Sequence, residues 1–327
     1  MSRTPWWQGR AVGLVALGAA VIAFGLFVHN PYYQNLAVTI GIQGLVALGL
    51  GLLMGWAGQI SLGHAGFYGL GAYASAILTT HFSLNPWLAL VAGAVSTGLI
   101  AYAVGRPTLR LRGHYLGMGT LGVGLIIQTV FVQWAAWTGG PSGITAVPPL
   151  VVGGLALDTD QRFFWLVWPV VLVALLLMGN LVNSRTGRAL RALGENEGAA
   201  SAAGVDVPRA KLAVFMLSTI FASVGGSLYA HYTSFVNPSP FGFAFSIQLL
   251  VMVIVGGARS VWGPLAGAAV LAALHQGLAT AAIRVPALEG LEVVAYGAIL
   301  VIFLIYRPQG LLRPRRAAGP RAEGETP

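Results

Sequence analysis

Long apolar runs separated by short polar stretches make up most of the chain. Runs of about 17–25 apolar residues are long enough to cross a bilayer core as helices. The pattern predicts ten such spans, over residues 11–28, 36–54, 62–80, 87–105, 114–136, 163–181, 211–230, 243–256, 262–282 and 288–306. The eighth is short for a full crossing, and Gly256 and Gly257 predict that it is broken or tilted. We therefore expect an all-α, polytopic membrane helix bundle.

Composition agrees with this picture. Of 327 residues, 56% are hydrophobic and 8% are charged, whereas about 25% are charged in an ordinary soluble domain. The 45 glycines favour the close helix packing that holds bundles together in lipid. Cysteine is absent, which excludes disulfides and thiolate metal sites. The first apolar run follows Arg3 and Arg10 as in a signal peptide, but it lacks a convincing cleavage site, so we expect an uncleaved first span.

Charge predicts how the spans are oriented. If the N-terminus is cytoplasmic, 16 of the 18 basic residues lie inside, and only Arg162 and Arg284 lie outside. The inner side then carries 16 basic and five acidic residues, a net charge of +11. The outer side carries two basic and four acidic residues, a net charge of −2, and the two sides add up to the total of +9. The positive-inside rule therefore predicts that both termini face the cytoplasm. Basic residues at the ends of apolar runs also argue against nucleic-acid binding.

The same pattern divides the chain into two parts. Residues 1–312 are expected to form a transmembrane domain. Residues 313–327 lack apolar content and are expected to be a disordered cytoplasmic tail, with arginines near the lipid headgroups.

The chain lacks the motifs of an energy-coupling or catalytic subunit. A phosphate-binding P-loop ends in Gly-Lys-Ser/Thr, but the one lysine, Lys211, follows Ala210. Any ATP must therefore be hydrolysed by another subunit. The histidines show no metal-binding pair, and no nucleophile elbow is present, so we expect neither a metal site nor an enzyme. Acidic residues fall in loops, in the tail or at span edges, which disfavours a proton-driven carrier, although carbonyl oxygens could hold sodium.

Polar side chains in or beside apolar helices are candidates for a substrate pathway. The alternative role is hydrogen bonding between helices, which contributes about 0.6 kcal/mol on average in membranes. The candidates are Gln43, Gln59, Ser61, His64, Gln128, Thr129, Ser218 and Gln248. Gln59, Ser61 and His64 stand out, because nearby glycines predict irregular backbone that lines a cavity.

The longest predicted cytoplasmic loop covers residues 182–210. It is rich in alanine, Glu195 and Glu197 suit a helix N-terminus, and Gly204 can end a helix, so we expect a short surface helix over 195–204. Its residues are equally compatible with a solvated connector and with a small-sided helix that docks into a groove of a partner.

Several motifs resemble those of a known transporter family. Glu197-Gly-Ala-Ala200 resembles the Glu-Ala-Ala loop of bacterial ABC importers, with Gly198 in place of the first alanine. Five further segments are similar to M-type (LivM-like) permeases of branched-chain amino-acid importers. They are GWAGQISLGHAGFYGLGAY (55–73), RLRGHYLGMGTL (110–121), TGGPSGI (138–144), RALRALGENE (188–197) and GGARSVWGP (256–264), and RPQGL (307–311) resembles the end of that family.

The resemblance implies an ABC-importer permease of ten helices that carries branched-chain or related amino acids inward. The implied partners are a second, homologous permease in a heterodimer, two ABC ATPase subunits that use ATP and Mg, and an extracytoplasmic substrate-binding protein. No cofactor is expected in this chain. The residues expected to couple to the ATPase are Arg188, Arg191, Glu195, Glu197, Ala199, Ala200 and Gly204. Permeases for urea, short amides or other amino acids are alternatives, as is a self-sufficient secondary carrier or channel.

Overall fold

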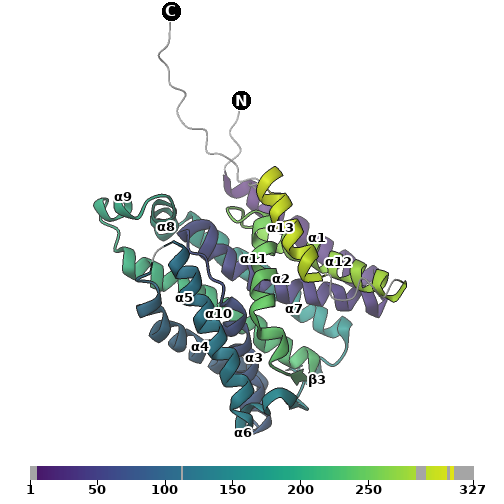
Figure 1. Cartoon of the computed structure of the whole chain (residues 1–327). Coiled ribbons are helices and arrows are strands. Elements are labelled where there is room, and N and C mark those ends of the chain that lie inside the picture. Colours follow the sequence, from purple (N-terminus) through teal and green to yellow (C-terminus); the bar gives the residue numbers. More distant parts are fainter. Residues whose placement is uncertain (1–5, 112, 285–291, 308–309, 313–327) are drawn as a thin grey trace, which may run out of the picture.

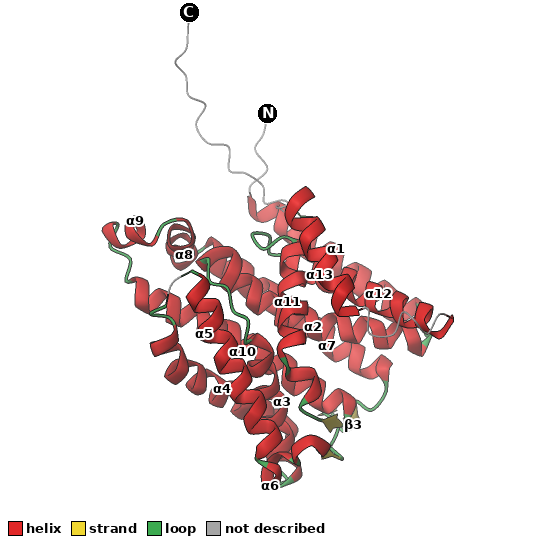
Figure 2. Ribbon diagram, viewed as in Figure 1, coloured by secondary structure: helices red, strands yellow, loops and turns green. Residues whose placement is uncertain are grey.

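A computed structural model describes residues 6–111, 113–284, 292–307 and 310–312, and they form a bundle of helices (Figures 1 and 2). The long helices are α1 (Trp6–Phe27), α2 (Pro31–Ala57), α3 (His64–Thr80), α4 (Pro86–Thr108), α5 (His114–Gln133), α7 (Asp160–Asn183), α10 (Val207–Thr233), α11 (Phe243–Gly256), α12 (Gly263–Arg284) and α13 (Glu292–Tyr306). The short elements are α6 (Ala135–Thr138), η1 (Gly140–Ser142), β1 (Ile144–Thr145), β2 (Val151–Val152), β3 (Leu155–Ala156), α8 (Arg185–Glu195), α9 (Glu197–Ala202), β4 (Phe235–Val236) and η2 (Ser239–Phe241).

Each of the ten predicted spans coincides with one of the long helices. Among the described residues, α2, α4, α5, α7 and α10 are long and apolar enough to cross a membrane, judged by length and composition. The predicted all-α fold is thereby confirmed, and its apolar helices are consistent with a membrane protein. The start of the tenth predicted span, 288–291, and the predicted tail, 313–327, lie outside the described residues.

Local sequence explains where several helices begin. Asn30 and Asn85 each accept a backbone hydrogen bond through the side chain, and a proline follows each of them in the first helical turn of α2 and α4. Asp206 plays the same part for α10. These residues satisfy amide groups that would otherwise lack partners at a helix start, where proline costs no hydrogen bond.

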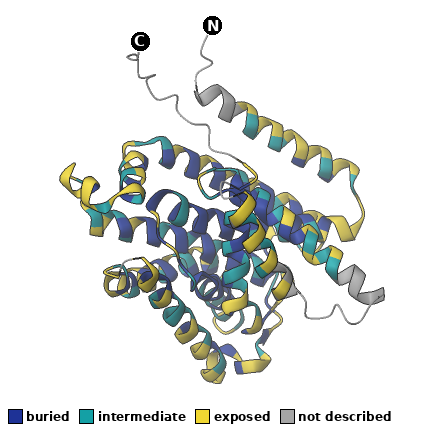
Figure 3. Cartoon of the chain, turned by 45° about the horizontal axis from the view of Figure 1, so that its top comes forward, coloured by how far each residue is buried: buried dark blue, intermediate teal, exposed yellow. Residues whose placement is uncertain are grey.

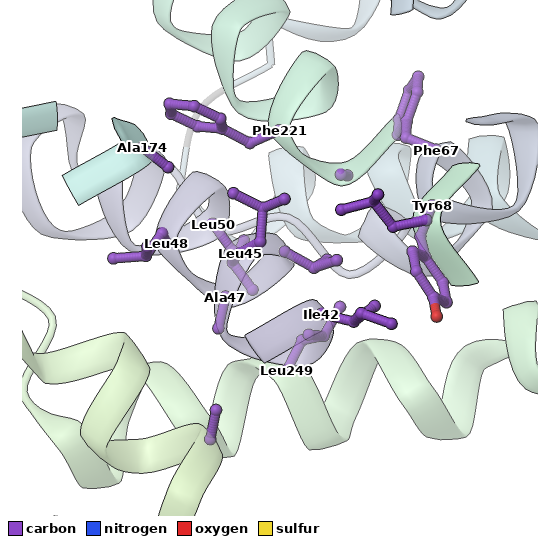
Figure 4. Close-up of a cluster of buried hydrophobic side chains, with 14 of the residues drawn as sticks. Ile42, Leu45, Ala47, Leu48, Leu50, Phe67, Tyr68, Ala174, Phe221 and Leu249 are labelled. Atoms are coloured by element: carbon purple, nitrogen blue, oxygen red, sulfur yellow. The ribbon is translucent and has the colours of Figure 1, made fainter. Parts of the chain in front are cut away.

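Helix α2 is the central element of the bundle, and most of its residues are buried (Figures 3 and 4). Its glycines let neighbouring helices approach closely on different sides. A Cβ atom at Gly44 would lie 2.5 Å from the Leu265 side chain of α12, and one at Gly49 would lie 2.6 Å from a backbone oxygen of α10. A helix that is apolar and buried all round belongs to the interior of a bundle.

Helices α3 and α10 run side by side in the same direction. The Ser227 hydroxyl donates to the Gly71 carbonyl (3.1 Å), and the Ser75 hydroxyl lies 2.9 Å from His231 Nε2, so paired positions advance together along both helices. A Cβ atom at Gly226 would overlap the carbonyl of Tyr68. This contact therefore depends on small residues, as expected for helices packed in lipid.

At one end of the bundle, segments distant in the sequence are tied together. The Tyr232 hydroxyl of α10 donates to Asp160 of α7 (2.7 Å) and accepts from Asn35 of α2 (2.6 Å). Strand β1 pairs antiparallel with β4, and β2 pairs with β3. Figure 1 shows α6 and β3 at this end and α8 and α9 at the opposite end.

Candidate functional site

The chain between α2 and α3 is irregular from Gly58 to Gly63, and we call this stretch, together with His64 and Ala65 at the start of α3, the irregular segment. Gly58 is exposed and has a left-handed φ of 63°, which ends α2. Six residues later His64 is completely buried, at the level of Ser218 on α10. Ser218 lies eleven residues from the start of α10, or about 16 Å at a helical rise of 1.5 Å per residue. The irregular segment therefore enters the interior of the bundle.

Backbone groups of this segment are satisfied by side chains of other helices. The Leu62 amide donates to the Thr120 hydroxyl of α5 (3.0 Å), and the Ala65 amide donates to the Ser246 hydroxyl of α11 (3.1 Å). Non-helical backbone inside a membrane protein requires such partners, because lipid provides none.

Three side chains of the segment carry polar atoms that are buried without a hydrogen-bond partner. They are both amide atoms of Gln59, Ser61 Oγ and His64 Nδ1, and the three residues are at most 2% exposed. Leaving a buried polar atom unpaired costs about 1–3 kcal/mol. Such atoms at a predicted pathway are suited to pair with water or a solute.

The second ring nitrogen of His64 contacts α10. His64 Nε2 lies 3.4 Å from the hydroxyl of Ser218, and that hydroxyl donates to the Gly49 carbonyl of α2 at 2.7 Å. The predicted candidates His64 and Ser218 are thus brought together, although 154 positions separate them in the sequence. We call Gln59, Ser61, His64 and Ser218 the polar cluster.

The other predicted pathway residues lie outside this cluster. Gln43 on α2 is half-buried with an unpartnered Oε1, and Gln248 on α11 is also half-buried. Gln128 is half-buried on α5, where it faces Gly242. Thr129 is exposed, and its hydroxyl donates to the Leu125 carbonyl of its own helix (2.8 Å), a satisfied arrangement that needs no ligand.

A small cavity adjoins the irregular segment. Its volume is about 10 Å³, at the lower limit of what can hold one water molecule. The residues that line it include Leu62, Gly66, Leu125 of α5, Phe241 and Ser246. The lining is almost wholly apolar.

The loop after α7 contains two helices, and the short helix predicted over 195–204 is confirmed within narrower bounds. Glu195 ends α8 instead of starting a helix, and α9 covers only Glu197–Ala202. The break lies at Asn196, which leaves the helical conformation (φ −156°, ψ 114°) and accepts a hydrogen bond from the Ala199 amide to start α9. An asparagine that caps a new helix outweighs the alanine-rich context.

Buried and exposed residues alternate along this loop in a helical pattern. Leu190 and Leu193 bury one side of α8 against the bundle, whereas the predicted residues Arg188, Arg191 and Glu195 are exposed. On α9 Ala200 is buried, Ala199 is exposed, and Gly204, also exposed, follows the helix with a φ of 85°.

Glu197 forms an ion pair that the sequence did not predict. Its carboxylate accepts from the ammonium group of Lys211 on α10. Lys211 was noted only as the lysine that excludes a P-loop. The signal for its role was its place among small and apolar residues at a helix start, where a buried lysine needs an acidic partner. Thr120 and Ser246, which hold the irregular segment, were also missed, because neither looks unusual within its own helix.

Residues 32–304 match the model of a protein family described as the permease component of the branched-chain amino-acid transport system. The chain belongs to this permease family. The chain is 33% identical to the high-affinity branched-chain amino-acid permease protein LivM of Escherichia coli K12, over 91% of this chain and 74% of that protein. It is also 25% identical to LivH of Salmonella typhimurium, over 84% of this chain and 92% of that protein. No solved structure matches.

The family match confirms the predicted resemblance to LivM-like permeases. It covers the polar cluster, the loop with α8 and α9, and nine of the ten predicted spans from the second onwards. This permease is therefore a multi-pass membrane transport protein.

Proposed function

We propose that this permease carries branched-chain amino acids into the cell as a subunit of an ABC importer. The observation that carries the proposal is the similarity to LivM along nearly the whole chain. The absence of a P-loop motif from the sequence supports separate ATPase subunits that use ATP and Mg. Similarity to both LivM and LivH supports pairing with a second, homologous permease, and the family supports an extracytoplasmic substrate-binding protein.

The proposed topology has ten spans, with both termini in the cytoplasm of a bacterial or archaeal cell. The coincidence of ten helices with ten predicted spans supports the count. The 16-to-2 division of basic residues supports the orientation. In this orientation α8 and α9 face the cytoplasm, and the opposite end of the bundle, which contains α6, faces outward.

The proposed docking surface for an ATPase is the exposed side of α8 and α9. Arg188, Arg191, Glu195 and Ala199 face away from the bundle there, and small residues flank them on α9. Replacement of Ala199 by tryptophan is expected to reduce co-purification of the ATPase, because the bulky ring would obstruct a close contact. Ala103→Trp on the exposed side of α4 is the control, and equal loss in both variants would contradict the assignment.

The polar cluster is the proposed part of the substrate pathway inside this subunit. Unpartnered buried atoms are costly, so the cluster fits a place that a solute or water occupies during transport. It contains no charged side chain, which fits weak, transient binding after an external protein has selected the substrate. ATP binding would shift the importer between inward-open and outward-open states, as alternating access requires.

Reconstitution tests this function. Proteoliposomes that contain this permease, its companion permease and ATPases, with binding protein outside and ATP inside, should accumulate labelled leucine. Vesicles that lack the ATPases should not. Uptake by this permease alone would indicate a secondary carrier or channel. Uptake of labelled urea or short amides, in the absence of leucine uptake, would indicate an amide permease. Either result would overturn the proposal.

A further inference from the structure

The ion pair between Lys211 and Glu197 joins the surface helix α9 to the membrane helix α10. Lys211 is the one lysine in the sequence, and its side chain is 5% exposed, whereas that of Glu197 is 35% exposed. A buried ammonium group is costly unless an acidic partner compensates it. Removing either partner is therefore far more disruptive than breaking an ion pair on the surface.

The ion pair lies on the side of α9 that faces the bundle. Glu197 and Ala200 lie three residues apart, hence on the same face of a helix, and Ala200 is 1% exposed. Gly198, Ala199 and Ser201 are exposed on the other side. A partner that docks on this outer side would therefore move α9 without touching the ion pair directly.

Helix α10 continues from Lys211 to the polar cluster. Ser218 lies seven residues further along the unbroken helix, so it shares a face with Lys211 about 10 Å away. The Ser218 hydroxyl contacts Gly49 and His64 there. A displacement of Lys211 therefore reaches the polar cluster through a single rigid helix.

A second connection runs from the same loop to the other side of the cluster. A Cβ atom at Gly194, near the end of α8, would lie 2.5 Å from the Trp56 carbonyl and 3.3 Å from the Gly58 amide. Gly58 begins the irregular segment that carries Gln59, Ser61 and His64. The loop with α8 and α9 thus contacts both the irregular segment and α10, the two elements that meet at His64 and Ser218.

We propose that Lys211 is a positioning residue for transport, whose ion pair with Glu197 passes the movement of α9 to the polar cluster through α10. The inference rests on the proposed ATP-driven function. Glu197 then serves mainly inside this subunit, and the exposed neighbours supply the contacts to the ATPase.

The test measures leucine uptake per ATP hydrolysed in proteoliposomes that contain the complete importer. Lys211→Gln should lower this ratio about tenfold, within the range of coupling between distinct sites, while the ATPase still co-purifies. Lys211→Arg should restore most of the ratio, since it keeps the charge. Arg209→Gln is the matched control, because Arg209 pairs with Asp206 (2.9 Å) on the same turn but is 88% exposed, so the wild-type ratio should persist.

A charge exchange covers the case in which Lys211→Gln does not assemble. Glu197→Lys combined with Lys211→Glu should assemble and raise the ratio above that of either single variant. A wild-type ratio in Lys211→Gln, or an assembled exchange variant as uncoupled as the single variants, would overturn the inference. Failure of the unaltered importer to take up leucine would instead overturn the proposed function.

Discussion

Replacing Ser218 by alanine separates a role in the pathway from a role in helix packing. The change removes the hydrogen bond to Gly49 (2.7 Å) and the contact to His64 (3.4 Å) with almost no change in volume. The lost bond should lower stability by about 0.6 kcal/mol, the average for hydrogen bonds between membrane helices. His64 would then lose its Ser218 contact while its Nδ1 already lacks a partner, so leucine uptake should fall by about threefold or more.

Ser223→Ala supplies the control on the same helix. Ser223 is also buried, and its hydroxyl accepts from Thr97 on α4 at 3.0 Å, away from the polar cluster. Thermal unfolding in detergent should show equal, small losses of stability for both variants. Initial rates of leucine uptake in proteoliposomes should fall only for Ser218→Ala. Equal uptake by the two variants would refute a role of Ser218 in the pathway.

Three further substitutions test the packing that positions the site, each by thermal unfolding in detergent. Gly226→Ala should lower the free energy of unfolding by about 1–3 kcal/mol, because its Cβ would overlap the backbone of α3. Gly122→Ala is the control and should have little effect, since the space around Gly122 is open. Equal effects of the two substitutions would contradict the close contact between α3 and α10. Tyr232→Phe removes two hydrogen bonds, to α2 and α7, and should lower the free energy of unfolding by about 1 kcal/mol, at about 0.6 kcal/mol for each bond. An unchanged midpoint of thermal unfolding would show that these hydrogen bonds do not stabilise this end of the bundle. Gly310→Ala should lower the free energy of unfolding by at least about 1 kcal/mol, because Gly310 has a φ of 73° just before Leu311 and Leu312, whose amides donate to carbonyls of α11. A stability equal to that of Gly122→Ala would disprove this.

The apolar pattern was sufficient to predict the helices but not their neighbours. Hydropathy depends on local sequence, and each predicted span coincides with a helix. The central place of α2 follows from glycines that face α10 and α12, and their partners lie more than 160 positions away. Nothing in the local pattern specifies which distant side chain will occupy the space above a glycine.

Within the candidate site, the motif around Gln59, Ser61 and His64 was predicted as irregular backbone that lines a cavity, and the structure shows an irregular segment there that carries these three buried side chains. Its role in transport remains a prediction. The helix break at Asn196 was missed, because helix propensity is summed over a window while a cap is decided by one residue and its backbone angles.

Hydropathy, length and motif order are properties of the linear chain, and they were sufficient to predict the membrane location, the family and the helix boundaries to within a few residues. The folded structure was needed to show that Ser218 contacts His64, that Thr120 and Ser246 accept hydrogen bonds from the irregular segment, and that Lys211 is paired with Glu197. These are contacts between separate elements, and they exist only where packing brings buried polar groups within hydrogen-bonding distance.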